Sequence, residues 1–203
     1  MAASDVESIS VSDLLAMSSA TDKQAFQDLW LGYTETYGNK ELRYEISKTY
    51  DTAKPEHILC FAGAEEGIYV AMRVLLRHND HAIIVVPNYQ AAETIPLDIC
   101  EVSGVPLNPE ENWSLDIDRV KNEIRPNTKL ISINFPNNPT GAILGRERFD
   151  ELINICRQSG LYLFSDEVYR LMEHDIRLRL PQVGDIYERG LSRSEEHTEL
   201  QSQ

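Results

Sequence analysis

The sequence is poor in cysteine, in positive charge and in long apolar runs, and each shortage excludes a class of protein. Its three cysteines, Cys60, Cys100 and Cys156, are widely spaced with no CxxC pair, so we expect neither a disulfide framework nor a zinc site, and a reducing, cytoplasmic setting. With 19 Lys and Arg against 33 Asp and Glu, the net charge is −14, which disfavours nucleic acid and anionic membranes as partners. No apolar run reaches the ~20 residues of a membrane span, and residues 1–12 do not resemble a secretory signal.

The 203 residues, of which 42% are apolar, suffice to bury a core, and their pattern alternates between two kinds of segment. Short apolar runs predict strands at residues 58–61, 81–86, 97–105, 130–134 and 161–164. Amphipathic segments predict helices at 39–50, 63–76, 116–124 and 146–159, the last ending at Gly160. This order predicts an α/β fold with a mostly parallel sheet covered by helices on both faces.

Both ends of the chain depart from this pattern. Residues 1–30 predict a helical arm without a core of its own, with helices capped by Ser12 or Asp13 and by Asp22. Residues 31–191 form the predicted main domain. Residues 192–203 have no apolar periodicity, which is typical of a solvated terminus. The string RSEEHT followed by ELQS also resembles a translated sequencing-library adapter, so we expect a non-native tail after about Leu191, with a smaller C-terminal domain missing.

Ligands of open α/β sheets bind beyond the carboxyl ends of the strands, and two such places precede the middle of the chain. The turn Gly63-Ala64-Glu65 opens a predicted helix, whose N-terminus is able to hold a phosphate, although most such turns are only turns. A Walker lysine and a GxGxxG motif are both missing, which disfavours ATP and dinucleotides. Tyr89 follows the strand at 81–86, where it either stacks on a flat ring or packs on the surface.

Two further strand ends carry polar side chains. Asn138 lies in a loop with more turn residues than a loop needs, and it presents a neutral amide. Asp166 follows the strand at 161–164, where a buried carboxylate requires a cation such as a protonated ring nitrogen. A metal ion is the weaker alternative, because only His174 and Asp175 lie near in sequence. Tyr169 is placed to address the same ligand as Asp166.

The motifs NNPTG at 137–141 and SDEVY at 165–169, in this order, resemble those of the class I/II aminotransferases among the fold type I pyridoxal-phosphate enzymes. The resemblance covers roughly residues 33–191. It implies a three-layer α/β/α large domain, pyridoxal 5'-phosphate as cofactor, and transfer of an amino group between an amino acid and a 2-oxo acid.

The resemblance also implies a role for each candidate residue. The Gly63-Ala64-Glu65 turn holds the cofactor phosphate and Tyr89 stacks on the ring. Asn138 and Tyr169 bond the phenolate oxygen, and Asp166 pairs with the ring nitrogen. Tyr33 matches a tyrosine that reaches the phosphate of the neighbouring subunit, which implies a homodimer.

The sequence departs from the family at the Schiff-base lysine, which lies some thirty-odd residues after the aspartate. No lysine follows Lys129. Because that lysine carries the proton during transfer, we expect this chain as written to be inactive and its parent to be active. The alternatives are a lysine-free cofactor-binding or regulatory protein, or another reaction of the same fold, such as decarboxylation, racemisation or cyclising elimination.

Overall fold

The structure, a computed structural model, describes residues 8–33 and 35–194 and divides into two compact units, Met1–Glu35 and Thr36–Gln203. The first unit holds helices α1 (Val11–Met17) and α2 (Ala20–Gln27), neither of which buries a residue, as expected of an arm without a core. The predicted caps were wrong: the hydroxyls of Ser10 and Ser19 accept the backbone N–H of Asp13 and Asp22, so these aspartates lie in the first helical turn.

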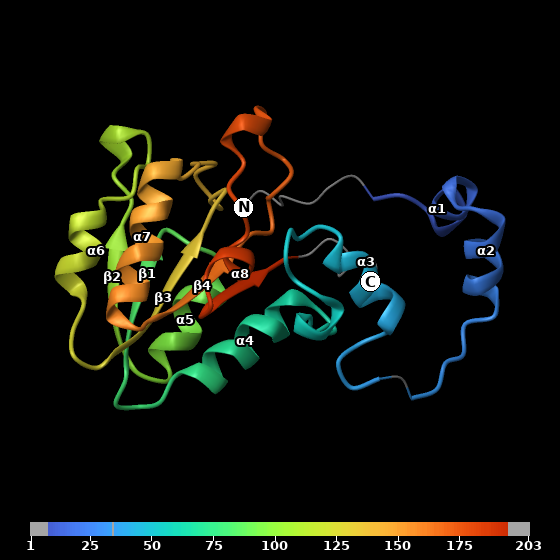
Figure 1. The fold of residues 1–203 in the computed structure, drawn as a ribbon, viewed down its shortest axis with the longest axis horizontal. Coiled ribbons are helices and arrows are strands. Elements are labelled where there is room, and N and C mark those ends of the chain that lie inside the picture. The colour runs from blue at the N-terminus through green and yellow to red at the C-terminus, as the bar shows by residue number, and fades with distance from the viewer. Residues whose placement is uncertain (1–7, 34, 195–203) are drawn as a thin grey trace. The chain divides into compact units, whose positions relative to one another are not determined.

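The second unit is built on one sheet of five parallel strands in the order β2-β1-β3-β4-β5 (Figure 1). The strands are β1 (His81–Val86), β2 (Glu101–Pro106), β3 (Thr128–Asn134), β4 (Tyr162–Asp166) and β5 (Gly190–Arg193). After β2 the chain crosses back over β1 to form β3 on its other side. The connection after β1 therefore leads to β2 in one direction, and the connection after β3 leads to β4 in the other. Such a switch point is where open α/β sheets form their ligand crevice.

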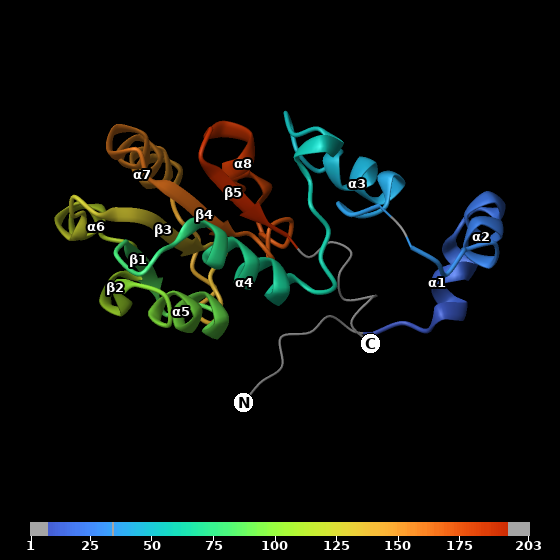
Figure 2. The ribbon, with the colours of Figure 1, turned by 90° about the horizontal axis from the view of Figure 1, so that it is seen from below.

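Helices cover both faces of this sheet, which confirms the predicted three layers (Figure 2). Helices α4 (Ala64–Leu75) and α5 (Gln90–Leu97) lie on one face. Helices α6 (Ile117–Glu123), α7 (Arg146–Ser159) and α8 (Val183–Ile186) lie on the other. Successive residues of a strand point to opposite faces of the sheet. Ile84 therefore packs in the cluster with Ile68 of α4, whereas Ile83 packs in the cluster with Phe149 of α7.

The predicted elements agree with the structure where turn residues mark their ends. The strand at 81–86 and the helix at 146–159 have the predicted bounds, and Gly160 ends the helix with a φ of 66°. The remaining predicted helices at 39–50, 63–76 and 116–124 correspond to α3 (Lys40–Ser47), α4 and α6 with slightly shorter bounds.

Two predicted strands were wrong. Residues 58–61 form no strand, and none of them is buried, although the Cys60 N–H bonds the carbonyl of Tyr37. Residues 97–105 contain two elements, because α5 extends to Leu97 and β2 begins only at Glu101. The backbone N–H groups of Ile99 and Cys100 bond the carbonyl of Pro96, so the chain turns where the apolar run predicted continuous extension.

The segment that leads to α4 is held to the sheet by Asp185 of α8. Its carboxylate accepts the backbone N–H groups of Asp51 (2.8 Å), Thr52 (2.8 Å) and Ala53 (3.0 Å). One side chain thereby satisfies three donors of a stretch without regular structure. This contact fixes the approach of the chain to Gly63, where the first candidate residues lie.

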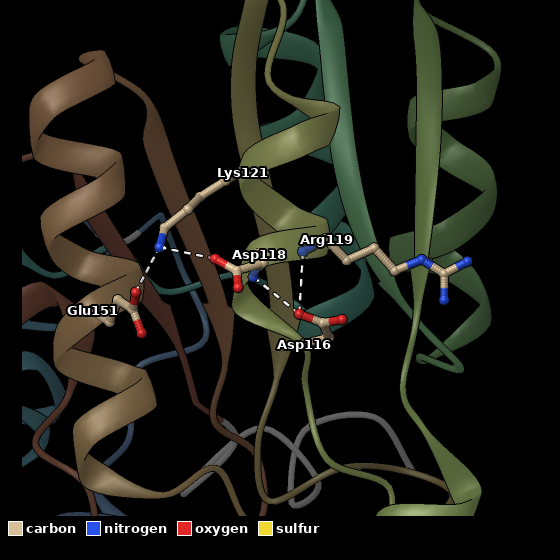
Figure 3. A network of polar contacts seen from close by, with 5 residues as sticks. All are labelled: Asp116, Asp118, Arg119, Lys121 and Glu151. Carbon is tan, nitrogen blue, oxygen red and sulfur yellow. Dashed lines mark hydrogen bonds and ion pairs between the residues drawn. The ribbon is translucent and has the colours of Figure 1, made fainter.

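A network of charges joins α6 to α7 at the surface (Figure 3). Lys121 donates to Glu151 (2.7 Å) and Asp118 (3.2 Å), and Asp116 caps α6 through the N–H groups of Asp118 and Arg119. The carboxylates of Asp118 and Glu151 are largely exposed, so these pairs contribute little to stability. We assign the network to helix packing and not to a site.

Across the described ranges 8–33 and 35–194, no helix has both the length and the apolar character that crossing a membrane requires.

Candidate functional site

The carboxyl ends of the parallel strands gather most of the predicted residues at one edge of the sheet. Tyr89 follows β1, Asn138 follows β3, and Asp166 ends β4. Helix α4 enters β1 through a short connection and therefore runs antiparallel to it, which puts its first turn, at Gly63, towards the same edge. The structure adds the strand order, which places a switch point between β1 and β3 at this edge.

The first turn of α4 has the features of an anion site. Gly63 is its N-cap with a φ of 116°, and no side chain caps this helix. A Cβ added at Gly63 would meet no atom within 4 Å, so the space in front of the backbone is open. Ala64 is buried and Glu65 is exposed, which leaves backbone N–H groups to define the turn. A helix N-terminus of this kind attracts negative charge.

Tyr89 is held at the start of α5 by its neighbour Asn88. The side chain of Asn88 accepts the Tyr89 N–H (2.7 Å) and donates to the carbonyl of Val85 (3.1 Å), while the Asn88 N–H bonds Glu93 (2.6 Å). Tyr89 is 37% exposed as a residue, so part of it is accessible to a ligand. The geometry leaves both predicted roles, stacking and surface packing, open.

Asn138 lies in a loop that asparagine side chains organise. Its backbone N–H donates to the Oδ1 atom of Asn134 (2.7 Å), and Asn134 is 1% exposed. Asn137 donates from Nδ2 to the carbonyl of Pro87 (3.0 Å) and accepts the Thr140 hydroxyl (2.7 Å). The loop after β3 is therefore fastened to the loop after β1, and Asn138 itself is half-buried.

Asp166 is 1% exposed, and its cation in this structure is Arg193. The Arg193 guanidinium donates to Oδ1 (2.8 Å), and the two residues are directly opposite each other in β4 and β5. Burial raises the pKa of the Asp166 carboxyl, and the charge and hydrogen bond of Arg193 oppose that rise. The sequence predicts a cation beside this carboxylate. In the structure that cation is Arg193, which belongs to the expected non-native tail.

Glu167, next to Asp166, is a buried carboxyl that sequence reasoning did not single out. It is 6% exposed and accepts the Val183 N–H (3.0 Å) and the Ser192 hydroxyl (2.9 Å) through Oε1. Burial raises its pKa from an ordinary 4.5 to about 7, and these two hydrogen bonds oppose the rise. Glu167 thus joins the end of β4 to α8 and β5.

The free energy of unfolding of the wild type should fall as the pH rises, and Glu167→Gln is expected to remove this fall. A carboxyl whose pKa is about 7 when folded keeps its proton between pH 4.5 and 7, whereas the unfolded chain loses it, so stability falls across this window. At ~1.4 kcal/mol per pKa unit, the variant should gain roughly 3 kcal/mol over the wild type between pH 5 and pH 8. Urea unfolding at several pH values measures the difference. Glu147→Gln, at an exposed position of α7, controls for the lost charge, and parallel curves for the wild type and Glu167→Gln would contradict the assignment.

The two remaining tyrosines belong to different units of the structure. Tyr169 lies in the turn after β4 and is half-buried, within reach of the Asp166 end of the sheet by chain connectivity. Tyr33 belongs to the first unit and is fully exposed. Its contact with a neighbouring subunit stays a prediction.

The residues that sequence reasoning missed share one signal, a polar side chain at the end of an apolar strand. Asn134 ends β3 as Asp166 ends β4, and Asn137 and Glu167 follow within three residues. Arg193 gave no such signal, because its partner depends on strand order. Within 8–33 and 35–194, no three His, Cys, Asp or Glu side chains are grouped to hold a metal ion.

Comparisons with known proteins agree with this geometry. A family model described as aminotransferase class I and II matches residues 11–193. The aspartate aminotransferase of Pyrococcus horikoshii is 32% identical over 167 residues, which cover 79% of this chain and 43% of that protein. The arginine–pyruvate transaminase of Pseudomonas aeruginosa is 29% identical over 75% of this chain and 42% of its own.

Among solved structures, a PLP-dependent aminotransferase from Streptococcus suis superposes with a TM-score of 0.84 and 32% identity, covering 92% of this chain and 50% of that one. The chain therefore spans about half the length, or less, of these proteins.

Proposed function

Because the chain belongs to the class I and II aminotransferases, we propose that the protein transfers an amino group between an amino acid and a 2-oxo acid with pyridoxal phosphate as cofactor. Members of this family use that cofactor. The observation that carries the proposal is the buried Asp166 carboxylate at the end of β4, beside the Asn138 loop and the switch point. A buried carboxylate is stabilised by a cation placed against it, and a protonated ring nitrogen is such a cation.

The residues present offer the cofactor a carboxylate, hydrogen-bond donors and an open approach, and the first turn of α4 also carries Glu65 and Glu66, of which Glu66 accepts the backbone N–H of Ala62 (3.1 Å). The uncapped first turn of α4 at Gly63 offers backbone N–H groups and an open approach to a phosphate. The exposed part of the Tyr89 ring offers a stacking surface. Asn138 and Tyr169 are the donors proposed for the phenolate oxygen. Arg193 now holds the carboxylate that the ring nitrogen would use, so it would have to give up part of this contact.

The chemistry is divided between the cofactor and the protein. When bound, pyridoxal phosphate supplies an electron sink for the carbanion of the substrate. Asp166 would hold its negative charge against the ring nitrogen, and the Coulomb attraction between the two would be strong because the carboxylate is only 1% exposed. Asn134 and Asn137 hold the loop of Asn138 in place, so the backbone of Asn138 is positioned before a ligand arrives. The proton carrier of the family, a lysine, is not among residues 130–203.

Substrates and partners follow as part of the same proposal. We propose amino acids and 2-oxo acids as substrates, a homodimer in which Tyr33 contacts the neighbouring subunit, and a cytoplasmic location. The aspartate and arginine substrates named for the two relatives differ too much to select one amino acid for this chain.

The test is an amino-transfer assay on the protein translated from the complete gene, next to the 203-residue chain. With pyridoxal phosphate, a panel of amino acids and a 2-oxo acid, we expect the complete protein to form the new amino acid and the 203-residue chain to form none. Release of carbon dioxide or racemised amino acid would indicate another reaction of the same fold. Cofactor binding without turnover by the complete protein would indicate a regulatory role.

A further inference from the structure

Asn134 is a buried amide at the end of β3, a strand whose buried apolar residues are Leu130, Ile131 and Ile133. It is 1% exposed, and its neighbours Ile131 and Ile133 are core residues. A buried amide without hydrogen bonds is costly, so its partners show what keeps it there. The structure gives both halves of this amide a partner.

The two partners are the backbones of the two residues proposed to hold the cofactor ring. The Nδ2 atom of Asn134 donates to the carbonyl oxygen of Asp166 (3.0 Å), which lies opposite it in the sheet register. The Oδ1 atom accepts the backbone N–H of Asn138 (2.7 Å). This side chain therefore joins the end of β4 to Asn138, beside the backbone N–H of Phe135, which donates to the same Asp166 carbonyl (3.3 Å).

The neighbouring Asn137 provides a contrast within the same loop. Its amide bonds the carbonyls of Pro87 (3.0 Å) and Asn134 (3.3 Å) and the hydroxyl of Thr140. These contacts join the loop to β1 and to itself, and none reaches Asp166. Among the hydrogen bonds given for these two side chains, only those of Asn134 connect Asp166 with Asn138.

We propose that Asn134 is a positioning residue of the cofactor site, which sets Asp166 and Asn138 at the spacing that the cofactor ring requires. The inference rests on the proposed function. Binding groups act only when held within about 0.5 Å of their productive geometry, and a loop of turn residues does not hold Asn138 so closely by itself. Both ends of the Asn134 amide are engaged by Asp166 and Asn138, so its effect passes through these two partners.

The test is a double-mutant cycle on binding of pyridoxamine 5'-phosphate to the 203-residue chain, measured by equilibrium dialysis. This probe carries the ring nitrogen, the phenolate oxygen and the phosphate but has no aldehyde to react with surface lysines. We expect Asn134→Ala to weaken binding about tenfold and Asn138→Ala about fivefold, because neutral hydrogen bonds are lost in each. If the two effects were independent, the double variant would lose affinity about 50-fold. We expect a loss of about 15-fold, because the position of residue 138 no longer affects binding once its amide side chain is removed.

Ser132→Ala is the matched control. Ser132 is a fully buried residue of β3, and its hydroxyl has no hydrogen-bond partner among the described residues, so we expect its affinity to stay within about twofold of the wild type. Circular dichroism melting shows that each variant is folded. If Asn134→Ala does not fold, Asn134→Ser, which keeps a hydroxyl at this position, takes its place in the cycle.

The outcomes separate the inference from the proposed function. If the folded wild-type chain binds no probe, the positioning role fails in this chain, where Arg193 is bound to Asp166. The proposed function fails only if the protein from the complete gene also transfers no amino group. If the wild-type chain binds the probe, two results contradict the positioning role alone. One is an unchanged affinity of Asn134→Ala for the probe, and the other is the full 50-fold loss of affinity in the double variant. A reduced loss in the double variant supports it.

Discussion

Asp166→Asn is expected to slow amino transfer by the protein from the complete gene by roughly two to four orders of magnitude. The substitution keeps the shape of the side chain and removes the charge that holds the ring nitrogen protonated. Removing one partner of a buried ion pair costs ~3–5 kcal/mol, and ~1.4 kcal/mol corresponds to a tenfold change in rate. The measurement is the single-turnover rate with a saturating amino acid, per mole of cofactor bound.

Two variants calibrate this result. Asn138→Ala should cost less, because a neutral hydrogen bond contributes only about 1 kcal/mol. Asp118→Asn removes an exposed carboxylate of α6 that pairs only with Lys121 at the surface, and we expect no change in rate. The assignment of Asp166 fails if Asn138→Ala is as damaging, or if Asp166→Asn keeps a rate near that of the wild type.

Arg193 adds a condition to this prediction. In the structure its guanidinium is bound to Asp166, and its side chain is only 11% exposed, so it competes with any other cation for the carboxylate. The amino-transfer comparison is therefore made in the protein from the complete gene, where the residue after Ser192 is read from the genome. The 203-residue chain, which carries this competitor, is used for comparisons among its own variants.

The sequence predicted best what local turn chemistry decides. Pro87 cannot continue a ladder of hydrogen bonds, and β1 ends before it. Gly160 takes up the left-handed conformation that ends α7. The places of Asp166 and Asn138 beyond the strand ends were predicted from the same alternation of strands and helices. Patterns of a few residues were therefore enough to predict the fold class and the positions of these two candidate residues.

The parts that escaped prediction depend on contacts between distant segments. Residues 58–61 are as apolar as a strand, yet no neighbouring strand pairs with them. β5 contains one apolar residue, Leu191, and forms a strand because β4 offers it an edge. The partner of Asp166 could not be predicted for the same reason, since Arg193 reaches it only through that pairing. Residues 195–203 of the expected tail lie outside the described residues.

Gly190→Ala is expected to be strongly destabilising. A Cβ at this position would lie 2.5 Å from Val183 Cγ1, 2.6 Å from the Val183 carbonyl oxygen and 2.9 Å from its carbonyl carbon. The side chain is able to rotate away but the backbone of α8 is not, so α8 and β5 must separate. Overpacking of a core costs ~1–3 kcal/mol or more, and a cost of about 3 kcal/mol lowers the Tm of a chain this long by roughly 6–12 °C.

The loss should extend to the candidate site, because β5 carries Ser192 and Arg193, the partners of Glu167 and Asp166. Thermal melting measures the global effect, and hydrogen exchange of the Glu167 N–H, which bonds the carbonyl of Arg193 (2.9 Å), reports on the β4–β5 pairing. Gly104→Ala is the control: it lies in strand β2, where the new methyl would meet only Val86 Cγ2 at 3.7 Å, and alanine in a strand is at least as stable as glycine. Equal melting temperatures for Gly190→Ala and Gly104→Ala would show that α8 does not pack against β5 as described, and the ties of Glu167 to Val183 and Ser192 would then lose their structural basis.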